Sequence, residues 1–392
     1  MYSKLKQPGF ESGYFLSILS AVFFLSACST IDTDAHAEIS CDWVLNTVHT
    51  INPYEFSPPV SIITNIINDS KGRLYFSQYR DPVIGLLDST GVFMQWIGKA
   101  GNGPGEFLSS HIIIGSMDSL IVQDFFLRRI NIYSPEDFTK PGRIINHDKF
   151  YNEMIITAEI DGFVYQTAPR HHLHMSQDSV FILKMNKSET TGDTILAVKG
   201  PDFIVERGDR SINVVHLADR RNIYFTYQPE SFTLFENDLN VISEYDYEGN
   251  VINQFEVTFP PVVDYSNLIE QQFSLMGGIS GDQLAEQFKT LSARHNSPYN
   301  RALFHEAIKL DDSYYFKLIV NSSQSKWLSY NKISGIDNTI IYCHENPTLS
   351  IKGHNGYYYY GTGITGDFEQ SLYLMEPVQV KLEESVPIYN PK

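Results

Sequence analysis

The strongest constraint on the fold is a pattern that recurs along the chain: an apolar run, a short polar turn, and a second apolar run. The runs are rich in β-branched and aromatic residues, which favour strands, and the turn residues supply backbone angles that strands lack. Successive copies lie about 45 to 60 residues apart, with one larger gap of about 85. The six copies are at Ile84–Asp88, Ile130–Tyr133, Phe181–Met185, Tyr245–Asn250, Trp327–Tyr330 and Leu372–Met375, the last with its turn at Glu376-Pro377.

A repeat of this length predicts an all-β fold, a six-bladed β-propeller, because a four-stranded blade takes about 40–50 residues. We place the propeller at residues 41–385, followed by a C-terminal tail at 386–392. The larger gap predicts a small helical insertion between blades 4 and 5, at residues 264–300. Ser280–Gln283 is typical of a helix capping box, and apolar residues follow it at helical spacing. The insertion either caps one end of the ring or decorates its rim.

The first 27 residues are predicted to be a lipoprotein signal peptide. Two lysines precede an apolar run, Tyr14–Leu25, that is too short to span a membrane. The run ends in Leu-Ser-Ala-Cys, which resembles the bacterial lipobox, where cleavage precedes the cysteine and its thiol receives a lipid. Cys28 is therefore the predicted lipidation site, and the polar residues 28–40 are the predicted tether. The alternative is an ordinary signal peptide that contains a cysteine.

Residues 43–48 form an apolar segment that precedes the first blade and has no partner within it. An unpaired edge strand is a liability, so we expect Trp43–Val48 to pair with the last blade and close the ring. A ring would also bring Cys41 and Cys343 near each other. In an oxidising envelope compartment they either form a disulfide or stay as two buried thiols.

The stretch Gly101–Phe107 reads Gly-Asn-Gly-Pro-Gly-Glu-Phe and can continue neither a helix nor a central strand. It resembles the inter-blade loop of NHL-type propellers, with Gly101, Gly103, Pro104, Gly105, Glu106 and Phe107 as the motif residues. With the lipobox and the repeat, the chain resembles the NHL-like six-bladed propeller lipoproteins of Bacteroidota, a largely uncharacterised family. The resemblance implies the fold and a lipid-anchored address at the outer membrane, on either its periplasmic or its surface face. It implies no reaction.

The sequence identifies no catalytic residue. No G-x-S-x-G, Walker, H-E-x-x-H or EF-hand motif is present, and a net charge of −17 without a Lys/Arg run argues against nucleic acid as a partner. His172 and His174 are weak metal-ligand candidates, since a solvated loop explains them better. Glu106 is expected to brace its turn. These observations favour a binding or scaffold module for a protein, peptide or glycan. The alternative is a hydrolase or lyase with Ca²⁺ or Zn²⁺ at the channel mouth.

Overall fold

The structure is a computed structural model, and the chain divides into two units, residues 1–40 and 41–392, of which the second holds every described strand. The described residues are 39–60, 62–78, 81–146, 154–160, 162–167, 179–185, 192–201, 203–207, 212–216, 221–260, 302–319, 324–333, 336–364 and 370–380. Cys28, His172, His174, the predicted insertion at 264–300 and the predicted tail at 386–392 lie outside them.

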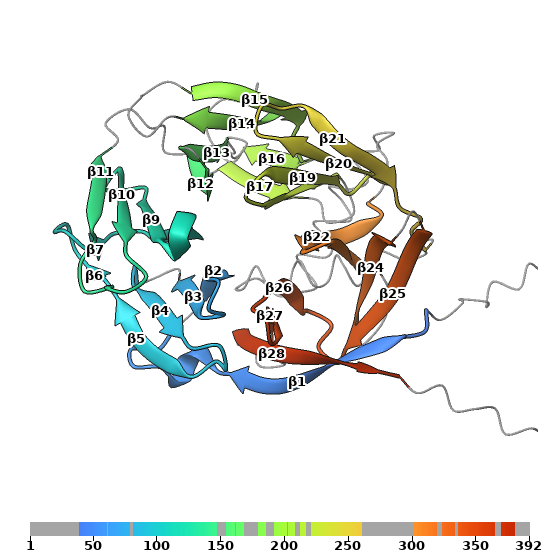
Figure 1. The fold of residues 1–392 in the computed structure, drawn as a ribbon, viewed down its shortest axis with the longest axis horizontal. Helices are drawn as coiled ribbons and strands as arrows, with labels where there is room; N and C mark the ends of the chain where they lie inside the picture. The colour runs from blue at the N-terminus through green and yellow to red at the C-terminus, as the bar shows by residue number, and fades with distance from the viewer. Residues whose placement is uncertain are drawn as a thin grey trace, which may run out of the picture. The chain divides into compact units, whose positions relative to one another are not determined.

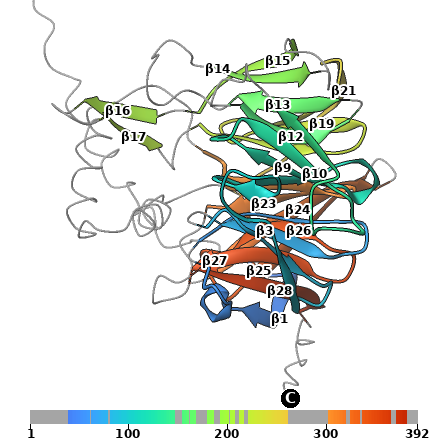
Figure 2. The same ribbon diagram turned by 90° about the vertical axis from the view of Figure 1, so that its left-hand side faces the viewer.

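Six four-stranded antiparallel blades follow one another along residues 41–392 and are arranged as a propeller (Figures 1 and 2). The first four blades are separate sheets, and the last two are joined into one eight-stranded sheet. Blade 1 is β2 (Ile63–Asn68), β3 (Leu74–Gln78), β4 (Ile84–Leu87) and β5 (Phe93–Ile97). Blade 2 is β8 (His111–Ile114), β9 (Leu120–Asp124), β10 (Arg129–Tyr133) and β11 (Arg143–Asn146). Blade 3 is β12 (Met154–Glu159), β13 (Phe163–Thr167), β14 (Ser179–Met185) and β15 (Gly192–Lys199).

The remaining blades follow the same order. Blade 4 is β18 (Ile223–Tyr227), β19 (Ser231–Glu236), β20 (Val241–Asp246) and β21 (Val251–Glu256). Blade 5 is β22 (Phe304–Leu310), β23 (Ser313–Leu318), β24 (Ser325–Ile333) and β25 (Ile336–His344). Blade 6 is β26 (Ser350–His354), β27 (Tyr359–Ile364), β28 (Gln370–Gln379) and β1 (Trp43–Ile51). Outside the blades lie the paired strands β6 (Lys99–Ala100) and β7 (Glu106–Phe107), the pair β16 (Phe203–Arg207) and β17 (Ile212–His216), and the 3-10 turns η1 (Pro53–Glu55) and η2 (Ser116–Asp118).

The predicted all-β, six-bladed fold is confirmed, and the repeat has a simple structural meaning. Each copy of the pattern contains residues of the third strand of one blade, from β4 in blade 1 to β28 in blade 6. The prediction of a sixth turn at Glu376-Pro377 is wrong, since β28 continues to Gln379. The reason is that the fourth strand of blade 6 comes from the other end of the chain, so no hairpin is needed there.

Strand β1 closes the ring as predicted. It pairs antiparallel with β28 from Trp43↔Gln379 to Ile51↔Leu372, three residues beyond the predicted segment. At its beginning Trp43 also pairs in parallel with Tyr342 of β25, which joins blades 5 and 6 at their outer edges. Just before β1, Cys41 and Cys343 form a disulfide with a Cα–Cα distance of 5.8 Å. The closure therefore combines a strand pairing with a covalent link.

The hairpin turns are organised by aspartates that precede a glycine by three residues. Asp69, Asp88 and Asp246 each accept hydrogen bonds from the backbone N–H groups two and four residues ahead. The glycine between them has a φ of +76° to +88°, which side-chain-bearing residues rarely adopt. These residues explain why the turns could be read from the sequence.

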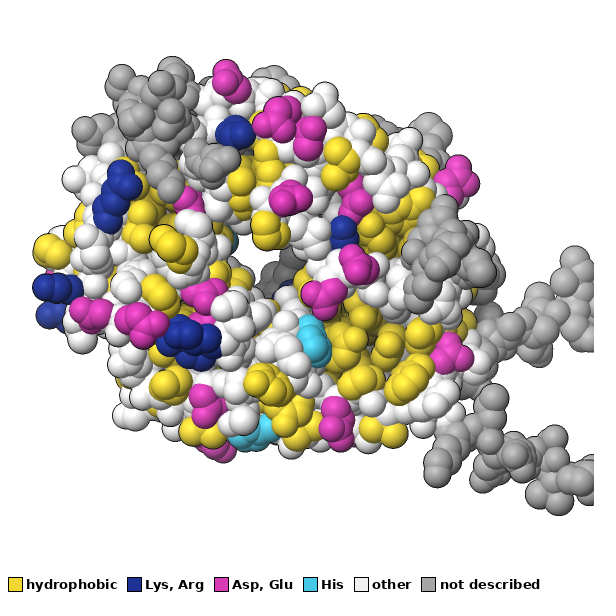
Figure 3. Space-filling model, in the orientation of Figure 1, with side chains coloured by type: hydrophobic (Ala, Val, Ile, Leu, Met, Phe, Trp, Pro, Cys, Tyr) yellow, Lys and Arg dark blue, Asp and Glu magenta, His cyan; other side chains and the backbone are white. Residues whose placement is uncertain are grey.

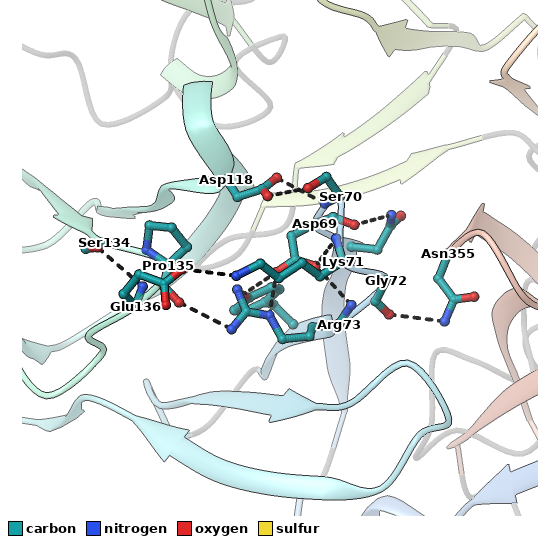
Figure 4. A network of polar contacts seen from close by, with 12 residues as sticks. Asp69, Ser70, Lys71, Gly72, Arg73, Asp118, Ser134, Pro135, Glu136 and Asn355 are labelled. Atoms are coloured by element: carbon teal, nitrogen blue, oxygen red, sulfur yellow. Dashed lines mark hydrogen bonds and ion pairs between the residues drawn. The ribbon is translucent and has the colours of Figure 1, made fainter.

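The turn at Asp69 also ties three blades together, as Figure 4 shows. Asp69 accepts hydrogen bonds from Nε of Arg73 at 2.6 Å and from the hydroxyl of Tyr75 at 2.9 Å. Neighbouring turn residues reach out on both sides: Ser70 donates to Asp118 of blade 2, and Asn355 of blade 6 donates to the carbonyl of Gly72 at 3.2 Å. This end of blade 1 is therefore a structural brace.

Apolar clusters fill seams between neighbouring blades. In the seam of blades 6 and 1, Leu74 and Phe76 pack with Leu372 and Leu374, and further cores fill the seams 1–2, 2–3, 3–4 and 5–6. Among the described residues, no helix is long and apolar enough to cross a bilayer.

Candidate functional site in the seam of blades 5 and 6

The first strands of the blades line the centre of the ring. Contacts join β2 to β8 and β26, β8 to β12, and β22 to β18 and β26. Figure 3 shows an opening at this centre in the space-filling view. Polar side chains on these six strands are therefore the ones nearest to any molecule that enters the opening.

Several polar side chains at or near the beginning of strands join neighbouring blades. Asn65 donates to the carbonyl of Ile112 at 2.7 Å, and the Oε1 of Gln370 accepts from the N–H of Ile63 at 2.6 Å. His111 donates through Nε2 to the carbonyl of Ile156 at 3.0 Å. Burial lowers the pKa of His111 to about 4, although the Ile156 carbonyl raises it in part. His111 is therefore neutral at pH 7, as a donor to a carbonyl in this seam.

The seam of blades 5 and 6 is different, because it holds charged groups. Glu306 of β22 lies directly opposite Lys317 of β23, and Nζ of Lys317 is 3.5 Å from Oε1 of Glu306. The hydroxyl of Ser350, the first residue of β26, donates to Oε2 of Glu306. Lys352 is exposed two residues further along the same strand. The Lys317 side chain is 5% exposed and the Glu306 side chain 23% exposed, so the cluster opens toward solvent through Glu306 and Lys352.

The charges in this cluster determine one another's protonation. Burial alone would raise the pKa of Glu306, but the ammonium groups of Lys317 and Lys352, with His305 and the Ser350 hydroxyl, lower it to about 2. Burial lowers the pKa of Lys317, and the Glu306 carboxylate offsets part of that effect. Burial also lowers the pKa of the adjacent His305 to about 4. At neutral pH the Glu306 carboxyl is therefore ionised.

A second ion pair in blade 5 shows what a purely structural pair looks like in this protein. Lys309 of β22 pairs with Glu244 of blade 4, and both side chains are almost fully buried. Tyr314 donates to Oε1 of Glu244 at 2.8 Å, and Asn253 donates to Oε2 at 3.1 Å. Both carboxylate oxygens accept from protein groups, as those of Glu306 do, but the Lys309 and Glu244 side chains are only 11% and 8% exposed. The pair is therefore more closed to solvent than Glu306, whose side chain is 23% exposed.

The motif Gly101–Phe107 lies elsewhere, in the connection between β5 and β8. Lys99 and Ala100 pair in parallel with Glu106 and Phe107, and the N–H of Gly101 donates to the carbonyl of Phe107 at 3.1 Å. Gly101 and Gly105 have φ values of +149° and +75°. Phe107 is fully buried in the seam of blades 1 and 2. The stretch is therefore the tight corner that its glycines predict.

Glu106 has partners typical of a turn brace. Its Oε2 accepts the N–H of Gly103 at 2.7 Å, and its Oε1 lies 3.0 Å from Nζ of Lys99. The Gly103 N–H and the Lys99 ammonium hold the pKa of Glu106 below its ordinary value. Arg129 donates to the carbonyls of Asn102, Gly103 and Glu106 from below the loop. The structure does not bring Glu106 together with Glu306 or Lys317.

The sequence reasoning missed Glu306, Lys317 and Lys352. The available signal was the presence of charged residues in three short strands that are mostly apolar, aromatic or small, Phe304–Leu310, Ser313–Leu318 and Ser350–His354. Such residues are rarely buried unless they are paired. Within the described part of the chain, no group of three His, Cys, Asp or Glu side chains is placed to hold a metal ion.

A solved structure with a TM-score above 0.5 supports the fold, and two further solved structures are similar below that value. An exported protein of Bacteroides fragilis superimposes with a TM-score of 0.51 at 11% identity, over 86% of this chain and 96% of that chain. A member of the DUF4221 family from Bacteroides vulgatus gives a TM-score of 0.48 at 9% identity, over 86% and 99%. A streptogramin B lyase gives 0.37 at 12% identity, over 87% and 88%.

No curated protein matches the chain. Residues 59–262, just over half of the sequence, match a family described as a 6-bladed beta-propeller, and they cover blades 1 to 4. The chain therefore belongs to the 6-bladed beta-propeller family DUF5128.

Proposed function

We propose that this protein is a ligand- or protein-binding module of the cell envelope, and that it binds at the cluster of Glu306, Lys317, Ser350 and Lys352. The observation that carries the proposal is the openness of this cluster. Its carboxylate is part-exposed and its second ammonium group is exposed, whereas the pair of Lys309 and Glu244 is closed. Burying charges costs free energy that a sealed apolar seam would avoid, so the cluster fits a functional role better than a stabilising one.

The geometry also favours binding over a merely local ion pair. The groups come from the first strands of two blades and from β23, and the polar side chains cited from the other first strands are used to hold blades together. A ligand that reached the centre of the ring would meet a carboxylate acceptor and ammonium donors on one side of the channel wall. Such a small set of convergent polar groups in an apolar frame is typical of binding sites.

The test is a comparison of binding to the purified full chain and to Lys352→Met. Lys352 is exposed, so its replacement should leave the fold intact. Neutral sugars, short peptides and small anions are titrated by calorimetry. A matched control is Lys71→Met, since Lys71 is an exposed lysine whose ion pair with Glu136 lies on the surface. We expect one of these three classes of ligand to bind to the wild type and to the control with similar affinity, and to bind to Lys352→Met at least tenfold more weakly. Equal binding to all three proteins, or none to any, would contradict the proposal.

The envelope address rests on the lipid anchor proposed at Cys28. The apolar run and the Leu-Ser-Ala-Cys sequence before it support this assignment. In cells, Cys28→Ser should move the protein from the membrane fraction to the soluble fraction and remove the lipid mass from the mature N-terminus. Membrane association that survives the substitution would contradict lipid anchoring without affecting the binding proposal.

A further inference from the structure

We propose that the site in the seam of blades 5 and 6 takes an anionic group, a carboxylate or a phosphate, and that Lys317, Trp327 and Ser325 are its donors. The inference rests on the proposed function, because it names the chemistry that the same site would recognise. It is carried by a set of buried donors that have too few acceptors.

The three donors lie on one face of blade 5. Lys317 is the direct cross-strand partner of Glu306 on one side and of Trp327 on the other. Directly opposed residues in neighbouring antiparallel strands project from the same face of the sheet. Ser325 lies two residues before Trp327 in β24 and therefore shares that face. Glu306, on the same face, accepts a hydrogen bond from Ser350 of blade 6. This face of blade 5 is therefore the one that faces blade 6.

The three donor side chains are buried and make fewer hydrogen bonds than they could. Trp327 is 1% exposed and Ser325 is 3% exposed, and neither the indole Nε1–H nor the hydroxyl has a hydrogen-bond partner in the described part of the chain. The Lys317 ammonium carries three N–H groups, and among the described residues it contacts only Oε1 of Glu306, at 3.5 Å. A buried donor without an acceptor loses its hydrogen bonds to water and gains none in return, which destabilises the protein. Two such donors beside an under-coordinated ammonium indicate a place for an acceptor.

The chemistry of these groups determines what kind of acceptor fits. An indole and an ammonium can only donate, so neither can satisfy the other. The Ser325 hydroxyl could also accept, but it has no hydrogen bond with the Trp327 indole in the structure. Oε2 of Glu306 already accepts from Ser350. Lys317 and Lys352 together carry one positive charge more than Glu306 neutralises, and hydrogen bonds to an ionised acceptor are the strongest ones available. The part-exposed Glu306 and the exposed Lys352 mark the side from which the anion would approach.

The indole N–H of Trp327 gives a direct readout. The chain has three tryptophans, so a tryptophan-labelled ¹⁵N sample of the full chain in detergent should show three indole signals. Trp327→Phe assigns its signal. Trp96 is an internal control, because its Nε1–H already donates to the carbonyl of Ser57 at 2.9 Å. Acetate and inorganic phosphate are titrated separately at constant ionic strength, on the wild type, Lys317→Met and Ser325→Ala.

We expect a saturable shift of the Trp327 signal, with the Trp96 signal unmoved, and at least tenfold weaker binding to Lys317→Met. Ser325→Ala should weaken binding less, which keeps the test valid if Lys317→Met misfolds. Saturable binding of both acetate and phosphate would indicate that the site recognises negative charge alone. Tighter binding of one of them would show whether the site selects a carboxylate or a phosphate. If neither anion moves the Trp327 signal while a neutral sugar or peptide does, the anion inference fails and the proposed function stands. If no ligand moves it, both fail.

Discussion

Removal of the disulfide between Cys41 and Cys343 should strongly destabilise the protein without opening the ring. The two cysteines are 302 residues apart in sequence, and the bond fastens the beginning of β1 to β25. β1 would still pair with β28 along its whole length after the bond is removed. We therefore expect the variant Cys41→Ala/Cys343→Ala to keep the native fold and to lose free energy of unfolding mainly through its effect on the unfolded chain.

The magnitude follows from the length of the loop. A cross-link that closes a loop of 302 residues removes chain entropy from the unfolded state worth up to about 6 kcal/mol at 25 °C. Native disulfides usually contribute about 2–5 kcal/mol, because unfolded chains keep some structure. Cys343 is fully buried, so Cys343→Ala adds a small packing loss. We expect a total loss of about 3–6 kcal/mol, a large fraction of the stability of a typical domain.

The assay is equilibrium unfolding in urea, followed by tryptophan fluorescence and circular dichroism, in a Cys28→Ser background that leaves one pair of cysteines. The double variant should unfold at lower urea with a steeper transition, since its unfolded state exposes more surface. A reductant should shift the parent protein to the same midpoint and leave the variant unchanged. Two free thiols in the oxidised protein would show that the pairing is wrong. An unchanged midpoint in the variant would refute the reasoning from loop entropy.

Three further outcomes are expected. Gly105→Val should lower the free energy of unfolding in urea by on the order of 1–3 kcal/mol, because Gly105 has a φ of +75°. The control is Gly142→Val, at a position where φ is not positive. Equal urea midpoints for the two variants would show that Gly105 is not a strained corner. Glu106→Gln should leave the thermal midpoint near that of the wild type, because an amide oxygen still accepts the Gly103 N–H, whereas Glu106→Leu should lower it; equal midpoints for the two variants would contradict the turn-brace role. Between pH 6.5 and about 4, His111 and His305 bind protons in the unfolded chain but stay neutral in the folded protein, so the free energy of unfolding should fall as pH falls. His111→Gln should make the free energy of unfolding less dependent on pH in this range. An unchanged pH dependence would contradict the assignment of His111 as a buried neutral histidine.

Local signals in the sequence account for most of the fold. Aspartate-glycine turns such as Asp88–Gly91 and Asp246–Gly249 were readable because their side chains and φ values act within five residues. The corner at Gly101–Phe107 was readable for the same reason. The pairing of Trp43–Val48 with the last blade was predictable because an edge strand leaves backbone N–H and C=O groups unpaired, and a free apolar segment can satisfy them. The turn at Glu376-Pro377 was misplaced, because the partner strand there comes from the far end of the chain.

The candidate site was decided by tertiary structure. Glu306, Lys317 and Ser350 lie on three strands, and only the register of β22 with β23 and the packing of blade 6 on blade 5 bring them together. The sequence shows a glutamate and two lysines, which on most surfaces would be solvated charges. The burial of Lys317, the low pKa of Glu306 and the unsatisfied donors of Trp327 and Ser325 exist only in the assembled seam. The physical reason is that turn geometry depends on neighbouring residues, whereas burial and electrostatic coupling depend on residues that the chain supplies from other blades.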